Sequence, residues 1–349
     1  MQSHSNEHNA SPEYSSSRDK IQGEQVIAEL IATHYDLGEV DLPTVPPRLH
    51  QRRHRKWMVS TDAGPFLVKT YHNDPVVIDA LHFQHRLAQH LAENRLPVAS
   101  IQAARNGKKL LVFDDWVMEL QRLMPGVPMQ VTTPNLIASA EALGRFHVCG
   151  AGLPMPPRDR NKWRFSETPF QAFQQLYETA RPLGDERQLQ KNCDAIAMYL
   201  QDAHEALRAE KRSKLETGLI HGDWHVGNLL FDNGALSAIL DLEFAGEGCF
   251  LEDIAYALSN LCIRTTKVPE KMKHRTNLLL DTYQRQRSLS IFELLALYYA
   301  VGVKQVTAVA YQIQQQGRAA GYDAAEWMQR LAAQCAWLEE QARRIRFGH

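Results

Sequence analysis

The feature that most limits the fold of this chain is a change in the spacing of its apolar residues near position 124. Before this point, apart from helical spacing over 24–37 and 75–94, the apolar residues form short runs separated by turn residues, at 57–60, 66–71, 109–113 and 116–123. Beyond it they recur mostly at helical spacing, over 136–149, 170–183, 188–207 and much of 253–346. Short runs predict strands and the longer period predicts helices. We therefore expect an α+β protein, with a small antiparallel sheet followed by a larger, mainly helical part.

The first part of the chain is expected to hold one helix on its sheet. Residues 1–20 are polar and carry little to bury, which predicts a disordered tail, and a helix is expected over 24–37. The runs 57–60 and 66–71 predict a hairpin, and apolar spacing over 75–94 predicts the helix carried by the sheet. The expected division is a lobe at 21–124 and a second lobe at 125–349.

Composition places the chain among ordinary globular proteins. Its 349 residues suffice for two lobes, and a net charge of -1 gives no general attraction to nucleic acid or to an anionic membrane. No uninterrupted apolar run of membrane-spanning length occurs, and the five cysteines are scattered without a C-x-x-C pair. We expect a cytoplasmic protein, a monomer or a homodimer, with no nucleic-acid or membrane partner.

The densest group of chemically active side chains lies between residues 221 and 243. Asp223 and Asn228 stand five residues apart, and Asp241 follows after two short apolar runs joined by the turn Asp232-Asn233-Gly234. Carboxylate and amide oxygens are the ligands that Mg²⁺ prefers, and a further carboxylate can orient an acceptor hydroxyl. This set is what phosphoryl transfer requires.

The pattern H-G-D-x-H-x-x-N, followed by a hairpin and I-x-D-x-E, resembles the aminoglycoside phosphotransferase and choline kinase group. Within that group the segment is most similar to type II homoserine kinases, methylthioribose kinases and bacterial stress-response kinases. The resemblance implies a bilobal protein-kinase-like fold that uses ATP and Mg²⁺. It also implies that Asp223 is the catalytic base and that Asn228 and Asp241 are the magnesium ligands.

Four neighbours have supporting or open roles. The resemblance implies that His221 braces the catalytic loop. Asp253 either caps the helix that it opens or accepts hydrogen bonds from the catalytic loop, and it is a support in both cases. His225 lies beside the base in sequence and is a candidate for acceptor contact. Glu243 is a candidate either for contact with the acceptor or for contact with the residues that bind the metal.

The nucleotide-binding half departs from the family pattern. Lys69, in the run Phe66-Leu67-Val68-Lys69, matches the strand lysine that neutralises the α- and β-phosphates. Its usual helical partner is a glutamate, and Gln84 stands at that position. The adenine hinge is expected at Leu120, Gln121 and Leu123. Residues 48–56 hold five Arg and Lys and two His but no glycine, so basic side chains would replace a glycine-rich phosphate loop.

The acceptor is expected to be small and neutral, zwitterionic or anionic. From residue 251 onward the chain has nine Asp and Glu against thirteen Lys and Arg, and the segment 158–164 is also basic, which disfavours a polycationic antibiotic. Two alternatives stay open. One is a Ser/Thr protein kinase of the stress-response kind, and the other is a nucleotide-binding regulator that has lost catalysis.

Overall fold

The computed structural model describes residues 17–44, 55–155 and 168–347. Most of the basic run at 48–56, the basic segment at 158–164 and residues 1–16 of the expected tail lie outside these ranges. The described chain forms two compact units, Met1–Asp79 with Ser100–Leu123, and Ala80–Ala99 with Met124–His349. The first unit ends at Leu123, and residues 80–99 belong to the second unit.

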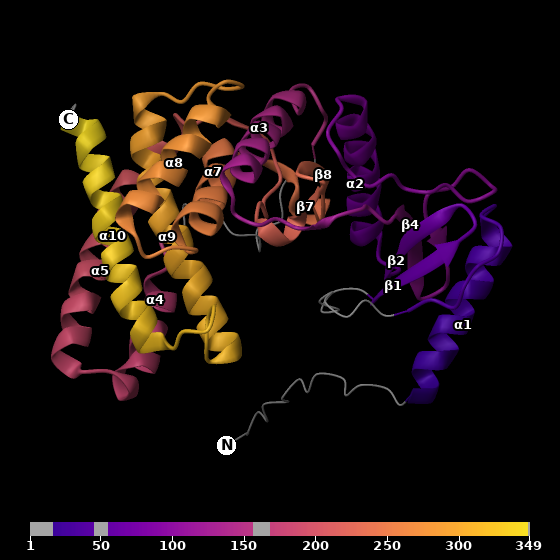
Figure 1. The fold of residues 1–349 in the computed structure, drawn as a ribbon, viewed down its shortest axis with the longest axis horizontal. Helices are drawn as coiled ribbons and strands as arrows, with labels where there is room; N and C mark the ends of the chain where they lie inside the picture. Colours follow the sequence, from indigo (N-terminus) through magenta and orange to yellow (C-terminus); the bar gives the residue numbers. More distant parts are fainter. Residues whose placement is uncertain (1–16, 45–54, 156–167, 348–349) are drawn as a thin grey trace, which may run out of the picture. The chain divides into compact units, whose positions relative to one another are not determined.

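The first unit is an antiparallel sheet covered by a helix on one face. Its strands run in the order β1-β2-β4-β3, with the β1–β2 hairpin turning at Asp62 and Ala63. The helix lies beside the sheet (Figure 1), and its Ile27 and Ile31 belong to one apolar core with Val68 and Met118 of the sheet. The elements are α1 (Ser17–His34), β1 (Arg55–Thr61), β2 (Gly64–His72), β3 (Leu111–Val112) and β4 (Trp116–Arg122).

Two expectations for this region need correction. Helix α1 begins at Ser17, so residues 17–20 are helical where a disordered tail was expected. The helix on the apolar face of the sheet is α1, and α2 (Pro75–Glu93) sends Phe83, Leu87 and Leu91 into the core of the second unit. Amphipathic spacing located both helices but cannot say which core each one joins.

The second unit is mainly helical, as expected, and is built around the buried helix α9. Helices α4, α5 and α10 pack against α9, and α10 runs beside α5 (Figure 1). Its helices are α3 (Thr133–Cys149), α4 (Phe170–Ala180), η1 (Arg181–Leu183), α5 (Glu186–Ala206), α6 (Ala209–Arg212), η2 (Val226–Asn228), η3 (Leu242–Phe244), α7 (Phe250–Ala257), η4 (Leu258–Ile263), α8 (Pro269–Tyr283), α9 (Ile291–Gln316) and α10 (Ala324–Phe347).

Five short strands interrupt the helices of the second unit. They are β5 (Val127–Pro128), β6 (Thr217–Ile220), β7 (Leu229–Asp232), β8 (Ala235–Ile239) and β9 (Gly246–Cys249). Strands β7 and β8 form the hairpin expected from the turn signal, with Asn233 and Gly234 both at positive φ (48° and 80°). That conformation matches the twist of a two-residue hairpin, and Asn-Gly adopts it readily.

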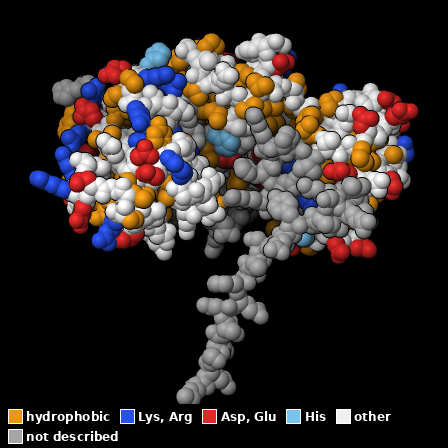
Figure 2. Space-filling view, turned by 60° about the horizontal axis from the view of Figure 1, so that its bottom comes forward, with side chains coloured by type: hydrophobic (Ala, Val, Ile, Leu, Met, Phe, Trp, Pro, Cys, Tyr) orange, Lys and Arg blue, Asp and Glu red, His pale blue; other side chains and the backbone are white. Residues whose placement is uncertain are grey.

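Helix α9 is long and apolar enough to cross a membrane by length and composition alone, a feature missed in the sequence. However, 72% of its most apolar window is buried inside the protein. That burial is the property of a core helix. On the face shown in Figure 2, acidic and basic side chains are interspersed over the helical unit, in keeping with the net charge of -1.

Candidate active site

The loop between β6 and β7 and the end of the β7–β8 hairpin bring the predicted catalytic residues together. Asn228 lies immediately before β7, and Asp241 follows shortly after β8. The N–H of Leu240 donates to the carbonyl oxygen of Asn228 at 2.8 Å, which extends the hairpin to this pair. The hairpin therefore places Asn228 next to the residue that precedes Asp241.

Asp223 is held in its ionised form by its neighbours. The Asn228 Nδ2 group donates to the carbonyl oxygen and to the Oδ2 atom of Asp223, both at 3.0 Å. His225 Nε2 lies 3.3 Å from the same Oδ2. Burial alone would raise the pKa of Asp223, but hydrogen bonds from His225 and Tyr256 outweigh it and hold that pKa well below its usual range. About a fifth of the side chain (22%) stays exposed, so a ligand can reach the carboxylate.

Tyr256 is a site residue that the sequence did not reveal. Its hydroxyl hydrogen-bonds Asp223, and its ring stacks on that of His225 with centroids 6.2 Å apart. Burial first and then the charge of Asp223 raise the Tyr256 pKa well above its ordinary value, so the group remains a donor. Tyr256 follows Asp253 by three residues on α7, a spacing that puts both on one helix face. The aromatic residue stands in an apolar run, where it looks like core.

His221 and Asp253 brace the loop by backbone contacts. Asp253 accepts from the N–H of His221 at 2.6 Å and from that of Gly222 at 2.7 Å. The His221 ring accepts from the N–H of Asp223 at Nδ1 (3.2 Å) and contacts the carbonyl of Leu240 through Nε2 (2.9 Å). His221 thus contacts both chain segments of the site. The alternative of an N-cap at Asp253 is wrong, since Cys249 caps α7.

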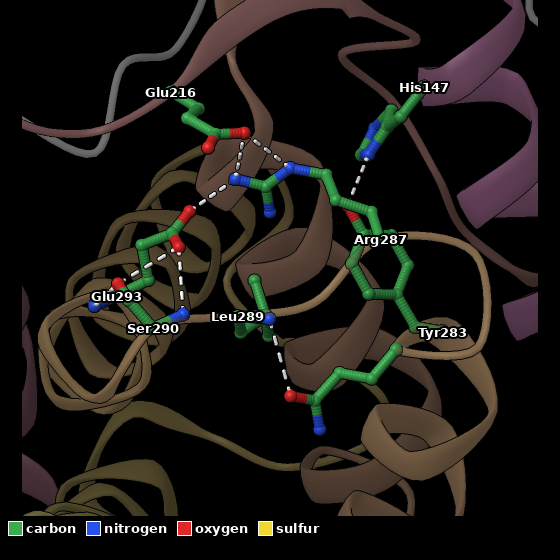
Figure 3. Close-up of polar contacts among 8 residues, drawn as sticks. His147, Glu216, Tyr283, Arg287, Leu289, Ser290 and Glu293 are labelled. Atoms are coloured by element: carbon green, nitrogen blue, oxygen red, sulfur yellow. Dashed lines mark hydrogen bonds and ion pairs between the residues drawn. The ribbon is translucent and has the colours of Figure 1, made fainter.

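A buried network lies behind Asp253. His147 Nε2 lies 3.2 Å from Asp253 Oδ2, and its Nδ1 lies 2.8 Å from the Tyr283 hydroxyl. Burial lowers the pKa of His147, so the ring is neutral, donating to Asp253 and accepting from Tyr283. Burial would raise the pKa of Asp253, but the hydrogen bond from His147 and those from the loop lower it. These contacts fix the anchor of the loop between β6 and β7, and Figure 3 shows His147 and Tyr283 joined in this way.

Asp241 has an unusual backbone conformation. Its φ and ψ are 52° and 67°, in the left-handed region that non-glycine residues seldom occupy. Asp is one of the residues that tolerate this region, because its short side chain can hydrogen-bond locally. Glu243 follows in η3 and is half-buried. Strain of this kind gathers at functional positions.

The donor set suits magnesium better than zinc. Within the ranges that the structure describes, no group of three or more His, Cys, Asp and Glu side chains is arranged to hold a metal. Asn228 points its amide nitrogen at Asp223, so its oxygen faces elsewhere, and Asp241 supplies a carboxylate. Mg²⁺ is commonly held by one or two protein oxygens together with phosphates and water, whereas structural zinc needs four protein ligands.

In the first unit, Lys69 lies in a row of buried charged residues. Lys69 pairs with Lys56 on β1 and with Glu119 on β4. Lys56 is 5% exposed, Lys69 is 6% exposed and Glu119 is 1% exposed. Glu119 also accepts hydrogen bonds from Tyr71 at 2.9 Å and from Gln121 at 2.7 Å. A carboxylate thus stands opposite Lys69 on the neighbouring strand. The sequence signal was a lone glutamate inside an apolar run.

The other predicted nucleotide contacts are placed as follows. Gln84 is half-buried on α2, in the part of that helix that belongs to the second unit. The carbonyl of Leu120 accepts from the N–H of Gln102 at 2.8 Å, and the N–H of Leu123 donates to Pro65 at 3.0 Å. The Gln121 side chain is bound to Glu119. Two of the expected hinge groups thus form contacts within their own unit, and the adenine contact stays a prediction.

Comparison with known proteins finds several kinases that are similar to this chain. A homoserine kinase of Nitrobacter hamburgensis is 27% identical over 264 residues, which cover 75% of this chain and 76% of that protein. The structure of a microcompartment-associated aminopropanol kinase matches 92% of this chain and 99% of its own, with a TM-score of 0.66 and 16% identity. An amicoumacin kinase in complex with AMP-PNP and Ca²⁺ matches 95% of this chain and 96% of its own, with a TM-score of 0.61 and 15% identity.

The two solved structures establish the kinase-like fold expected from the sequence. The family follows from a wider match, because the model of the phosphotransferase enzyme family (APH) covers residues 44–289, more than half of the chain. That range contains the β1–β4 sheet, the catalytic loop and the β7–β8 hairpin. The chain therefore belongs to the phosphotransferase enzyme family.

Proposed function

We propose that this protein transfers the γ-phosphoryl group of ATP to a hydroxyl group of a small neutral, zwitterionic or anionic metabolite. The observation that carries the proposal is the geometry of Asp223. Its carboxylate is partly exposed, ionised, and hydrogen-bonded at 3.0 Å to Asn228, which the hairpin joins to the Asp241 segment. One carboxylate to meet an acceptor hydroxyl, beside two oxygen ligands for Mg²⁺, is the set that phosphoryl transfer needs.

Asp223 acts mainly by orientation. A carboxylate whose pKa lies well below its usual range is a weak base, so it does not fully deprotonate an alcohol in the ground state. It instead accepts a hydrogen bond from the acceptor hydroxyl and aligns its oxygen. The proton passes to Asp223 as the bond to phosphorus forms, which suits a loose transition state. His225 and Tyr256 keep the carboxylate fixed and ionised.

Asn228 and Asp241 are the proposed Mg²⁺ ligands. When bound, the ion would supply positive charge that neutralises the negative charge developing during transfer. Asp241 follows the end of the hairpin and has a left-handed backbone conformation. Lys69 is the proposed contact to the α- and β-phosphates, and Glu119, rather than Gln84, is the proposed carboxylate that orients it.

Two observations support the proposed acceptor class, namely the names of similar proteins and the charge of the C-terminal part of the chain. The relative from Nitrobacter hamburgensis is named a homoserine kinase, and the similar structure is an aminopropanol kinase, so both acceptors are small alcohols. The excess of basic over acidic residues beyond position 251 disfavours a polycation. An amino-acid alcohol or a hydroxy acid satisfies both conditions. We place this reaction in the cytoplasm.

The test is an ATP-consumption screen against hydroxylated metabolites, run with the wild-type protein and with Asp223→Asn. We expect Mg²⁺-dependent turnover of at least one small alcohol, and a loss of about 10²–10⁴-fold in kcat in the variant. Thermal unfolding and circular dichroism of the variant check that it folds. Full activity in Asp223→Asn would refute the mechanism.

Two further assays, protein labelling and ATP binding, decide between the alternatives. Phosphate transfer from labelled ATP to lysate proteins, without turnover of small alcohols, would indicate a protein kinase. Binding of ATP without any turnover would indicate a regulator that has lost catalysis.

A further inference from the structure

Two arginines of the second unit have buried N–H groups that nothing in the described chain satisfies. Arg264 follows the π-helix η4, whose wider turn is closed by the bond from the N–H of Arg264 to the carbonyl of Ser259 at 3.0 Å. Arg330 lies on α10 and donates through Nη2 to the carbonyl of Arg264 at 3.3 Å. The Nε and Nη2 atoms of Arg264 and the Nε and Nη1 atoms of Arg330 are buried without a hydrogen-bond partner.

The surroundings of these guanidinium groups are aromatic and basic. Arg330 stacks on the rings of Tyr322 and Trp327, at 4.3 Å and 4.8 Å from their centres. Lys267 lies 4.7 Å from the Tyr322 ring. Among the residues that the structure describes, no carboxylate forms an ion pair with Arg264 or Arg330.

A buried cation without an anionic partner is unfavourable for the fold itself. Each guanidinium N–H removed from water costs free energy unless it gains a hydrogen bond in return, and the cost is larger for a charged group. The burial lowers the pKa of Arg264, which expresses the same penalty on its charged form. A π-helical turn is itself frequent at functional sites. An anionic ligand that accepted hydrogen bonds from these N–H groups would remove this penalty.

Tyr256 connects this cluster to the catalytic aspartate. Its hydroxyl hydrogen-bonds Asp223, and the charge of Arg264 acts on the same hydroxyl. Lys304 of α9 lies over the Tyr256 ring, with Nζ 3.8 Å from the ring centre. One phenol thus contacts the residue that meets the acceptor hydroxyl, and two basic side chains lie around it. A small acceptor with its hydroxyl at Asp223 would extend towards these side chains.

We propose that Arg264 and Arg330 bind an acidic group of the acceptor, a carboxylate or a phosphate, while its hydroxyl is held at Asp223. This inference rests on the proposed function and narrows its acceptor class from neutral, zwitterionic or anionic to acceptors that carry an anion. Arginine suits the task because its planar fork donates two parallel hydrogen bonds to a carboxylate or a phosphate. The aromatic rings hold the Arg330 guanidinium in place without neutralising it.

The first experiment compares acceptors that differ only in the acidic group. Homoserine and 3-amino-1-propanol have the same hydroxyl and amine, and only homoserine has a carboxylate. The pair 4-hydroxybutyrate and 1-butanol repeats the comparison without the amine, and glycerol 3-phosphate against glycerol tests a phosphate. We expect the wild type to favour the acidic member of at least one pair by about 10-fold or more in kcat/KM.

The second experiment uses the variant Arg264→Gln, which removes one guanidinium group. We expect kcat/KM for the acidic acceptor to fall by about 10–100-fold, with the neutral partner unchanged within about 2-fold. Arg264→Lys should recover part of the loss, since it keeps the charge but not the fork. Arg285 is exposed and lies two residues after α8, so Arg285→Gln makes the same change of charge and is the matched control. Equal kinetics in Arg264→Gln and Arg285→Gln would overturn the proposal.

Thermal unfolding separates a binding role from a structural one. If the buried N–H groups await a ligand, Arg264→Gln keeps or raises the Tm of the ligand-free protein while it loses the acidic acceptor. A lower Tm with unchanged discrimination between the paired acceptors would assign Arg264 to packing and end the proposal.

A last experiment tests the anion site separately from the kinase function. If the wild type phosphorylates none of the alcohols, the proposed function fails, and the anion site is tested by itself with inorganic phosphate and acetate in the absence of nucleotide. We expect either anion to raise the Tm of the wild type and of Arg285→Gln more than that of Arg264→Gln. Equal shifts in all three proteins would refute the site.

Discussion

Glu119 on β4 lies directly opposite Lys69 on β2, and both side chains are buried on the face of the sheet that α1 does not cover. Side chains opposite each other in antiparallel strands lie within interaction distance. The pairing gives Lys69 a carboxylate neighbour within its own sheet, where the sequence pointed only to Gln84 on α2.

The first prediction follows from this pairing. Glu119→Gln removes the carboxylate but keeps the shape, so Lys69 loses the charged group that stands opposite it and is proposed to orient it. We expect the KM for ATP to rise by about 10-fold, measured by steady-state kinetics with saturating acceptor. Gln84→Ala is the control and should change this KM by less than about 3-fold. The opposite order of effects would mean that the helix residue orients the lysine.

A second prediction concerns the magnesium requirement. Asp241→Asn removes the carboxylate charge, and Asn is well suited to the left-handed backbone at this position. We expect the half-saturating Mg²⁺ concentration to rise by about 10-fold or more while the Tm changes by only a few degrees. A Mg²⁺ titration of activity measures the first quantity, and differential scanning calorimetry measures the second. An unchanged Mg²⁺ requirement would remove Asp241 from the metal site.

A third prediction is a dependence of stability on pH through His147. Its pKa is lowered in the folded protein, so below the ordinary value of 6.5 the unfolded chain binds a proton that the folded chain does not. Stability contributed by neutral His147 is therefore full above about pH 6.5 and is lost as the pH falls below it, at about 1.4 kcal/mol per pH unit. Asp253, whose pKa is also lowered, adds a similar loss only below about pH 3.9.

Urea unfolding of the wild type and His147→Gln between pH 7.5 and 5 checks this. On acidification, the unfolding free energy of the variant should fall less per pH unit than that of the wild type. This comparison does not depend on the stability of the variant at neutral pH. His274→Gln replaces an exposed histidine of α8 and should keep the slope of the wild type. Parallel slopes in all three proteins would assign the acid sensitivity to other groups.

A fourth prediction concerns the arginine at the centre of Figure 3. Arg287 donates to Glu216 through Nε and Nη2 at 2.9 and 2.8 Å and also to the buried Glu293, which caps α9 through Ser290. Burial would raise the pKa of Glu293, but the hydrogen bond from Arg287 lowers it. Arg287→Met leaves this carboxylate buried and unpaired, and should cost about 2–4 kcal/mol of unfolding free energy.

The double variant Arg287→Met with Glu293→Gln is the control for that value. Because it removes the uncompensated charge, it should recover part of the loss, measured by urea unfolding in a double-mutant cycle. Additive losses would mean that the two side chains stabilise the protein independently.

The parts of the fold that the sequence predicted well are those encoded locally. The turn at Asn233-Gly234 and the two runs beside it predicted the β7–β8 hairpin, and the five-residue spacing of Asp223 and Asn228 identified the loop in which the two side chains are hydrogen-bonded. Contacts between distant segments were harder to find. Tyr256, like His147, stands in an amphipathic helix where aromatic rings are usually core, and only the packing of α7 against the loop shows its contact with Asp223.

The same contrast between near and distant contacts has a consequence for folding kinetics. Asn228 and Asp241 are joined through one tight hairpin, whereas the anchor from His147 to Asp253 closes a loop of 106 residues. Short loops close faster than long ones, and hairpins form within about 1–10 μs. We therefore expect the two proposed metal ligands to meet early in folding, and the catalytic loop to become rigid only when α3 docks on α7. A slow step in refolding should then delay the recovery of activity, whereas the hairpin should form before that step.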